Sequence, residues 1–240
     1  MPKPRKSYAL WLMGHALHLL FVLLIFSVCA LICWRVFISA IPPSEMKRLS
    51  PNAKLAEAYR TYGEDLTLYT QEQASVTKDD ANYGYFGVTR CVFIPDAEQV
   101  QVTFRYNNST LRHVMEDYAL VEEPPRGVEI FDVSIVKVVD ATPEDTGDNV
   151  DGSENLVKTR IAPSDRKIDT TALYTYILYT FDDVDMTDDT ITAYFDIYYS
   201  QDVNYDKDAY GTLRLYHRDN ARLPVKLSGK EEKALQNYGK

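Results

Sequence analysis

The pattern of apolar and polar positions divides the chain into an N-terminal apolar stretch and a longer body. Residues 16–34, ALHLLFVLLIFSVCALICW, contain no Asp, Glu, Lys or Arg, and the apolar character continues to Ile41. A helix needs about 20 apolar residues to cross a bilayer core roughly 30 Å thick. The apolar region of a cleaved signal peptide is only about 7–15 residues long. The stretch therefore predicts a transmembrane signal anchor over residues 8–41, which ends at Pro42-Pro43 because proline cannot continue a helix.

The flanks of the apolar stretch agree with a membrane span. Trp11 and Trp34 lie roughly 35 Å apart at the rise of an α-helix, which is the spacing of the two interfacial aromatic belts. Cleavage after Ala40, in the sequence FISA, remains the alternative. We expect His15 and His18 to be neutral side chains at interface level rather than members of a proton relay, because no other polar residue joins them before Ser27.

Charge gives the expected orientation of the span. Basic residues are tied on its two sides, at Lys3, Arg5 and Lys6 before it and at Arg35, Lys47 and Arg48 after it. Residues 1–41 carry four basic and no acidic side chains, so residues 42–240 carry a net charge of −13, against −9 for the whole chain. An acidic body is easier to place away from the anionic inner leaflet. We predict a cytoplasmic N-terminus (residues 1–7), a bilayer partner for residues 8–41 and an extracytoplasmic body on the cell membrane.

The three cysteines bear on the kind of organism. Cys29 and Cys33 lie in the span, so Cys91 is alone in the body and cannot form an internal disulfide. Extracellular domains of animals are usually stapled by disulfides. The body has enough residues to fold on a hydrophobic core alone. This usage favours a bacterial envelope protein.

After the span, a short helix is predicted before the pattern changes. Ser50 is a suitable N-cap followed by Pro51 at the first helical position, and Gly63 is a suitable stop. We assign residues 42–84 to a helical and irregular linker between the membrane and the folded domain.

From Phe86 onward, apolar residues recur with a period of two, which indicates half-buried strands. Strands are predicted at residues 87–94, 98–106, 128–140, 170–181, 190–199 and 210–217, with weaker candidates at 66–69 and 223–227. No helix of crossover length separates them, so the strands should be antiparallel. The sequence predicts an all-β fold, an antiparallel two-sheet sandwich of immunoglobulin-like architecture over residues 85–227, followed by a polar C-terminal tail at 228–240.

Tyrosines outside the span give the first candidate binding surface. Ile191, Ala193, Phe195 and Ile197 are expected to face the core, as are Leu213 and Leu215. The expected outward-facing set is Tyr194, Asp196 and Tyr198 on one strand, Tyr210, Arg214 and Tyr216 on another, and Tyr174 and Tyr176 if their strand is a neighbour. Such a surface can act as an aromatic platform for a glycan or a peptide. The more common explanation is cross-strand pairing that stabilises the sheet.

Three loops concentrate carboxylates, at residues 140–154, 182–189 and 202–208. The last loop places oxygen donors at alternate positions, Asp202, Asn204, Asp206 and Asp208, as calcium loops do. It lacks the glycine and the distal glutamate of an EF-hand, since Lys207 and Leu213 occupy those positions. A solvated acidic rim is therefore expected, with a calcium site of another type as the alternative, and we assign no metal and no cofactor.

Signatures of enzymes are missing from the sequence. His113 and His217 have no metal-ligand spacing, and no G-x-S-x-G elbow or phosphate-binding glycine loop occurs. An acidic body without a basic stripe argues against nucleic acid as a partner. We predict a single-pass, membrane-anchored envelope protein whose acidic β-sandwich binds a protein or cell-wall partner, without catalysis. The alternatives are a hydrolase of an envelope polymer that uses loop carboxylates, and an accessory subunit of a membrane complex.

Overall fold

The computed structural model describes residues 6–71, 86–127, 129–140, 156–185, 191–206, 209–217 and 219–239. The chain divides into two units, Met1–Ile41 and Pro42–Lys240.

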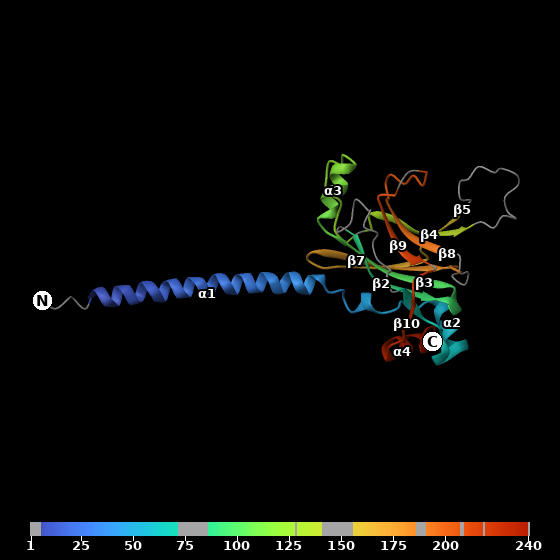
Figure 1. Ribbon diagram of the computed structural model, residues 1–240, viewed down its shortest axis with the longest axis horizontal. Coiled ribbons are helices and arrows are strands. Elements are labelled where there is room, and N and C mark those ends of the chain that lie inside the picture. The colour runs from blue at the N-terminus through green and yellow to red at the C-terminus, as the bar shows by residue number, and fades with distance from the viewer. Residues whose placement is uncertain are drawn as a thin grey trace. The chain divides into compact units, whose positions relative to one another are not determined.

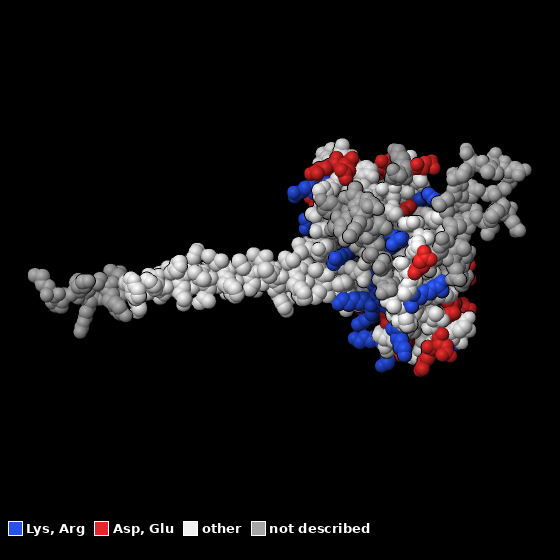
Figure 2. Space-filling model, in the orientation of Figure 1, with Lys and Arg blue, Asp and Glu red and all other residues white. Residues whose placement is uncertain are grey.

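The first unit contains one helix, α1 (Lys6–Ala40). Its segment Trp11–Ala40 contains a window of 18 residues with a mean hydropathy of 2.8, and no residue of this window is buried. The helix satisfies its own polar side chains, since Ser27 Oγ donates to the Leu23 carbonyl at 2.8 Å. The part of α1 that Figure 2 draws in white shows no charged side chain on the face seen. The expected N-terminal apolar helix is thus confirmed, and a helix of this length and composition serves either as a membrane anchor or as a signal sequence.

The second unit is mostly β-structure, in two antiparallel sheets (Figure 1). The six-stranded sheet has the order β10-β1-β2-β3-β7-β6, and the four-stranded sheet has the order β5-β4-β8-β9. The strands are β1 (Tyr69–Gln71), β2 (Phe86–Ile94), β3 (Gln99–Asn107), β4 (Phe131–Asp140), β5 (Leu156–Ile161), β6 (Asp165–Thr170), β7 (Tyr174–Asp182), β8 (Ile191–Tyr199), β9 (Gly211–His217) and β10 (Arg222–Pro224). The predicted pair of antiparallel sheets is confirmed.

Three short helices and three 3₁₀ turns complete the described part of this unit. They are α2 (Ala53–Tyr62), α3 (Thr110–Asp117), α4 (Gly229–Gln236), η1 (Glu45–Lys47), η2 (Gly63–Asp65) and η3 (Pro95–Ala97). Neither α3 nor α4 was expected from the sequence, and neither were strands β5 and β6. Strand β6 is an edge strand with the sequence DRKIDT and no buried residue, so the apolar alternation that reveals a half-buried strand is missing there.

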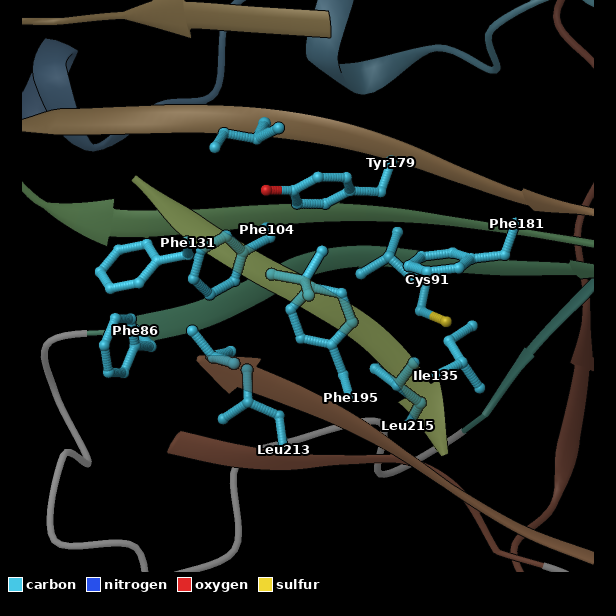
Figure 3. Packing of buried hydrophobic residues seen from close by; sticks show 14 of the residues in the cluster. Phe86, Cys91, Phe104, Phe131, Ile135, Tyr179, Phe181, Phe195, Leu213 and Leu215 are labelled. Carbon is cyan, nitrogen blue, oxygen red and sulfur yellow. The ribbon is translucent and has the colours of Figure 1, made fainter. Parts of the chain in front are cut away.

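The main core lies between the sheets and is rich in aromatic rings (Figure 3). Phe104 of the six-stranded sheet meets Phe195 of the four-stranded sheet with ring centroids 5.3 Å apart. Phe86 and Phe131 meet edge to face at 5.5 Å, which is a favourable arrangement of ring quadrupoles. Cys91 points into the same core, and burial raises the pKa of its thiol, so this free cysteine is held as an unreactive apolar side chain.

A second core lies on the outer face of the six-stranded sheet, on the side away from the four-stranded sheet (Figure 1). Helices α2 and α4 cover this face and pack on each other. The buried residues that form it are Leu49, Leu55, Ala56, Ala58, Leu66, Leu68, Val92, Ile94, Ala97 and Leu235. Helix α2 begins at Asn52, whose side chain accepts from the Leu55 amide at 2.9 Å, and ends at Gly63, whose φ of +58° favours glycine.

Polar side chains of β3 fix the segment that precedes α2. Gln101 Oε1 accepts from the Ser50 amide at 2.7 Å, and Gln101 Nε2 donates to the Ser50 carbonyl at 2.9 Å. Thr103 Oγ1 donates to the Met46 carbonyl at 2.9 Å. The structure thus places residues 42–71, assigned above to a linker, against the sheet as part of the second unit.

Helix α4 holds the same segment from the other side through a buried carboxylate. Glu231 Oε1 accepts from the Leu49 amide at 2.7 Å, and Oε2 accepts from the Ser228 amide at 2.8 Å and from Ser228 Oγ at 2.6 Å. Arg90 lies 3.5 Å from the same carboxylate. Burial alone would raise the pKa of Glu231, but the hydrogen bonds from Ser228 and Leu49, helped by Arg90, outweigh it and lower the pKa.

Candidate functional site

The outer face of the four-stranded sheet differs from that of the six-stranded sheet. None of the three hydrophobic clusters that the described residues form extends over it. Its side chains follow from the strand register, in which Val136 lies opposite Arg160 on one side and opposite Tyr194 on the other. The next outward residues along the strands bring Asp196 opposite Ser134 and Thr212. An apolar, aromatic and charged surface is therefore exposed here.

A cleft of about 500 Å³ lies on this face. Strands β4, β5, β8 and β9 form its floor, and Tyr205, Asp206 and Ala209, which lie between β8 and β9 in the sequence, contribute to one wall. Its lining residues are Val136, Val138, Lys158, Arg160, Tyr194, Asp196, Tyr198, Tyr205, Asp206, Ala209 and Thr212. The volume lies within the range of sites that bind small ligands, roughly 300–1,000 Å³.

Arg160 is the centre of the polar interactions in the cleft. Its guanidinium donates to Ser134 Oγ and, at 3.2 Å, to the Tyr198 hydroxyl oxygen. It lies 3.5 Å from Asp196 Oδ2. The guanidinium carbon also lies 4.4 Å from the ring centre of Tyr205 and 5.1 Å from that of Tyr198, within the range of cation–π attraction. These contacts fix the side chain in one orientation.

Tyr205, which lies between β8 and β9 in the sequence, packs on the sheet. Its hydroxyl donates to the Asp132 carboxylate, and its ring meets that of Tyr198 edge to face with centroids 5.1 Å apart. The hydrogen bond to Asp132 raises the pKa of the Tyr205 phenol. Tyr205 stays 50% exposed. Tyr205 thus covers Arg160 and still offers an aromatic surface to a ligand.

Asp196 provides the acceptor at the end of the cleft. Thr212 Oγ1 donates to Asp196 Oδ1 at 3.0 Å, and Arg160 lies at the other oxygen. Burial raises the pKa of the Asp196 carboxyl, and Thr212, Arg160 and Lys158 oppose that rise without cancelling it. The carboxyl is therefore a positioned hydrogen-bonding group whose charge is compensated within the cleft.

The structure brings part of the predicted tyrosine platform together. Tyr194, Asp196 and Tyr198 all line the cleft, as their alternation along β8 predicts. Tyr174 and Tyr176 lie in β7 of the other sheet, where Tyr176 is buried against Met46, so they do not share this face. Tyr210 packs against Phe86 and Phe131 and donates to the Asp117 carboxylate.

Tyr216 was expected to face outward, and this expectation is wrong. A β-bulge shifts the register of β8 and β9 between Ala193 and Tyr194, so Leu215 and Tyr216 are both buried. The extra residue of a bulge reverses which side chains face the core beyond it. Tyr216 accordingly lies in the main core, where its hydroxyl accepts from Arg222 at 2.7 Å.

The carboxylate loops lie mostly outside the described residues. This applies to residues 141–155, 186–190 and 207–208, so the alternation that favoured calcium at Asp202–Asp208 is described only as far as Asp206. There, the Asp206 amide donates to Asn204 Oδ1 at 3.0 Å. Within the described ranges, no three His, Cys, Asp or Glu side chains are grouped as metal ligands.

Sequence reasoning did not single out Lys158, Arg160 or Tyr205, which line the cleft with the expected residues. Lys158 and Arg160 belong to β5, a strand that the sequence pattern did not reveal. One signal was present, because Lys158 and Arg160 alternate with Val157, Thr159 and Ile161 and thus share a face. Comparison with protein-family models, with curated proteins and with solved structures finds no match to this chain.

Proposed function

We propose that this chain is a single-pass membrane protein of a bacterial cell envelope that binds a protein or cell-wall partner through the outer face of its four-stranded sheet. In this proposal α1 remains in the bilayer, the N-terminus is cytoplasmic and the body is extracytoplasmic. The immunoglobulin-like arrangement of the sandwich stays a prediction. The observation that carries the proposal is the cleft around Arg160, where aromatic rings, a compensated ion pair and an apolar floor meet on a face that no hydrophobic cluster of described residues covers.

Binding is favoured over the alternative of hydrolysis by the environment of Asp196. A glycosidase needs one carboxyl group that gives up a proton and a second that acts as base or nucleophile. Asp196 instead accepts from Thr212 through one oxygen and pairs with Arg160 through the other, so both of its oxygens are already engaged. This arrangement suits a fixed acceptor for a ligand. The third possibility, an accessory subunit of a membrane complex, would place the principal contacts on α1.

A photoreactive amino acid at position 194 of the full-length chain, in cells that produce it, tests the proposal. The control carries the same residue at position 62, since Tyr62 is an exposed tyrosine on α2 (46%) that the proposal keeps away from the partner. Irradiation should give a discrete adduct from position 194 and none from position 62. Equal adducts from both positions, or adducts only from positions in α1, would reject the proposed binding face.

A further inference from the structure

We infer that the ligand of the cleft is a short segment of an oligosaccharide, held with its ring against the aromatic walls and its hydroxyl groups toward Asp196, Thr212 and Lys158. This inference rests on the proposed binding face and adds the chemical class of the ligand.

The shape of the cleft suits a flat ring with polar edges. Arg160 and Tyr194 lie opposite Val136 on either side, so they are separated by two strand spacings, about 10 Å. Tyr205 covers Arg160 on one wall, and Tyr194 stands on the other. The small apolar side chain of Val136 leaves the space between them open. A pyranose ring has C–H groups on its faces and hydroxyl groups around its edge, so it matches aromatic walls and polar ends.

The charge of the cleft excludes a cationic ligand. Aromatic cages bind quaternary ammonium groups by cation–π attraction. Here the position between the rings of Tyr198 and Tyr205 is already occupied by the Arg160 guanidinium. A second cation would be repelled at that position. Because Asp196 compensates Arg160, the cleft also lacks the excess of positive charge that a polyanion needs.

The backbone of the sheet disfavours an extended peptide. Peptides that bind to sheets as added strands use the free hydrogen-bonding groups of an edge strand. The middle of the floor is formed by β4 and β8, and each is paired on both sides, β4 with β5 and β8, and β8 with β4 and β9, while the edge strands β5 and β9 border it. The middle of the floor therefore offers side chains and no backbone partners. Hydroxyl groups of a saccharide can be bound by side chains alone.

Three polar groups lie where the edge of such a ring would be. Asp196 accepts hydrogen bonds, Lys158 donates them, and the Thr212 hydroxyl can do both. Asp196 is fixed by Thr212 and Arg160 before any ligand arrives, and Lys158 is exposed. Positioned acceptors and donors of this kind reduce the ordering cost of binding.

Titration calorimetry of the full-length chain in lipid nanodiscs tests the inference, with tetra-N-acetylchitotetraose and cellotetraose as probes. Nanodiscs are required because maltoside and glucoside detergents carry saccharide headgroups themselves. We expect at least one tetrasaccharide to bind. Tyr194→Ala should weaken its binding about tenfold through the lost ring contact, and Lys158→Gln should weaken it about threefold. Tyr62→Ala, on the helix-covered side, should leave the affinity unchanged.

Two results would overturn the inference: no heat of binding from either tetrasaccharide at millimolar concentration, or binding that Tyr194→Ala and Lys158→Gln both leave unchanged. Lys158 is exposed, so its substitution tests the cleft without a risk to folding. The photoreactive residue at position 194 distinguishes a wrong ligand class from a wrong binding face. If it gives an adduct with a protein while the saccharides do not bind, the ligand class is wrong and the binding face stands. If it gives no adduct either, both fail.

Discussion

The outer faces of the two sheets have similar sequence patterns, but in the folded protein one face is covered by other parts of the chain and the other is partly exposed. On the six-stranded sheet, the outward residues Gln99, Gln101 and Thr103 are at most 2% exposed. Gln101 and Thr103 bond to the chain that crosses them, and Gln99 donates to Asp182. On the four-stranded sheet, Tyr194 and Asp196 are partly exposed and line a cleft. Polar residues at alternate positions of a strand thus indicate a face that is not part of the main core. They do not indicate whether another layer of the protein covers that face.

The covered face is built from both ends of the second unit. Residues 46–68 and helix α4 meet on it, and Glu231 joins them through the Leu49 amide. This arrangement buries aliphatic side chains and pairs every oxygen of the carboxylate. The open face instead holds a partly buried arginine–aspartate pair and aromatic edges, which stabilise a fold less than a close-packed core does. The outer face of the six-stranded sheet therefore contributes stability, whereas the outer face of the four-stranded sheet is left open for the proposed binding.

The largest expected difference between the faces is in stability. Leu55→Ala, at a fully buried position under α2, should lower the free energy of unfolding of the second unit by about 3 kcal/mol, because it leaves a cavity in the second core. Tyr194→Ala on the open face should cost less than about 1 kcal/mol. Urea unfolding followed by near-UV circular dichroism of tyrosine measures both, since Trp11 and Trp34 both lie in α1 and do not report on the sheets. Equal losses would remove the distinction between the two faces.

Substitution of Glu231 on the covered face should have the next largest effect on stability, and this effect should depend on pH. Glu231→Gln should lower the stability at neutral pH by about 2 kcal/mol, because charge-assisted bonds to Ser228 and the Leu49 amide are weakened. The folded pKa of Glu231 is below its unfolded value, so this stabilisation is complete above about pH 4.3 and is lost as the pH falls through the folded pKa. The native chain and the variant should therefore converge in acid. A constant difference from pH 7 to pH 3 would show that the charge is not responsible.

The same contrast explains which parts of the molecule the sequence predicts. Alternation locates the strands of the main core, because residues such as Val102 and Phe104 are separated by polar ones. It also places Tyr194, Asp196 and Tyr198 on one face. It does not reveal the second core, where hydrogen bonds such as those between Gln101 and Ser50 depend on residues distant in the chain.

One missed element carried a local signal. Helix α4 begins with a capping box, in which the Ser228 side chain accepts from the Glu231 amide while the Glu231 side chain accepts from the Ser228 amide. The spacing Ser-x-x-Glu is visible in the sequence and favours a helix start. The bulge in β9 has no such signal, since a reversal at Leu215 depends on how β9 pairs with β8. The wrong expectation for Tyr216 follows from that.

Arg160→Gln tests whether the open face is organised by its ion pair. The variant removes the main counter-charge of Asp196, whose folded pKa is already raised by burial. Its pKa should rise further, and a raised carboxyl pKa means that stability falls as the pH rises through the range between the unfolded and folded values. We expect the variant to be about 1 kcal/mol less stable than the native chain at pH 7 and nearly equal to it at pH 4. NMR titration of the Asp196 side chain checks the direction of the shift, and an unchanged or lowered pKa would contradict the role given to Arg160.

The smallest expected difference in stability is between removing the hydroxyl of a tyrosine in the core and removing that of a tyrosine on the open face. Tyr216→Phe removes a hydroxyl that accepts from Arg222 at 2.7 Å, and should cost about 1 kcal/mol because the fully buried tyrosine loses its hydrogen bond to a charged donor. Tyr194→Phe, where the hydroxyl borders the open cleft, should change stability by less than about 0.5 kcal/mol. The same urea unfolding experiment compares the two variants. If Tyr194→Phe lowered stability more than Tyr216→Phe did, the strand would continue past Leu215 without a bulge. Tyr216 would then lie on the outer face and belong to the recognition surface and not to the core.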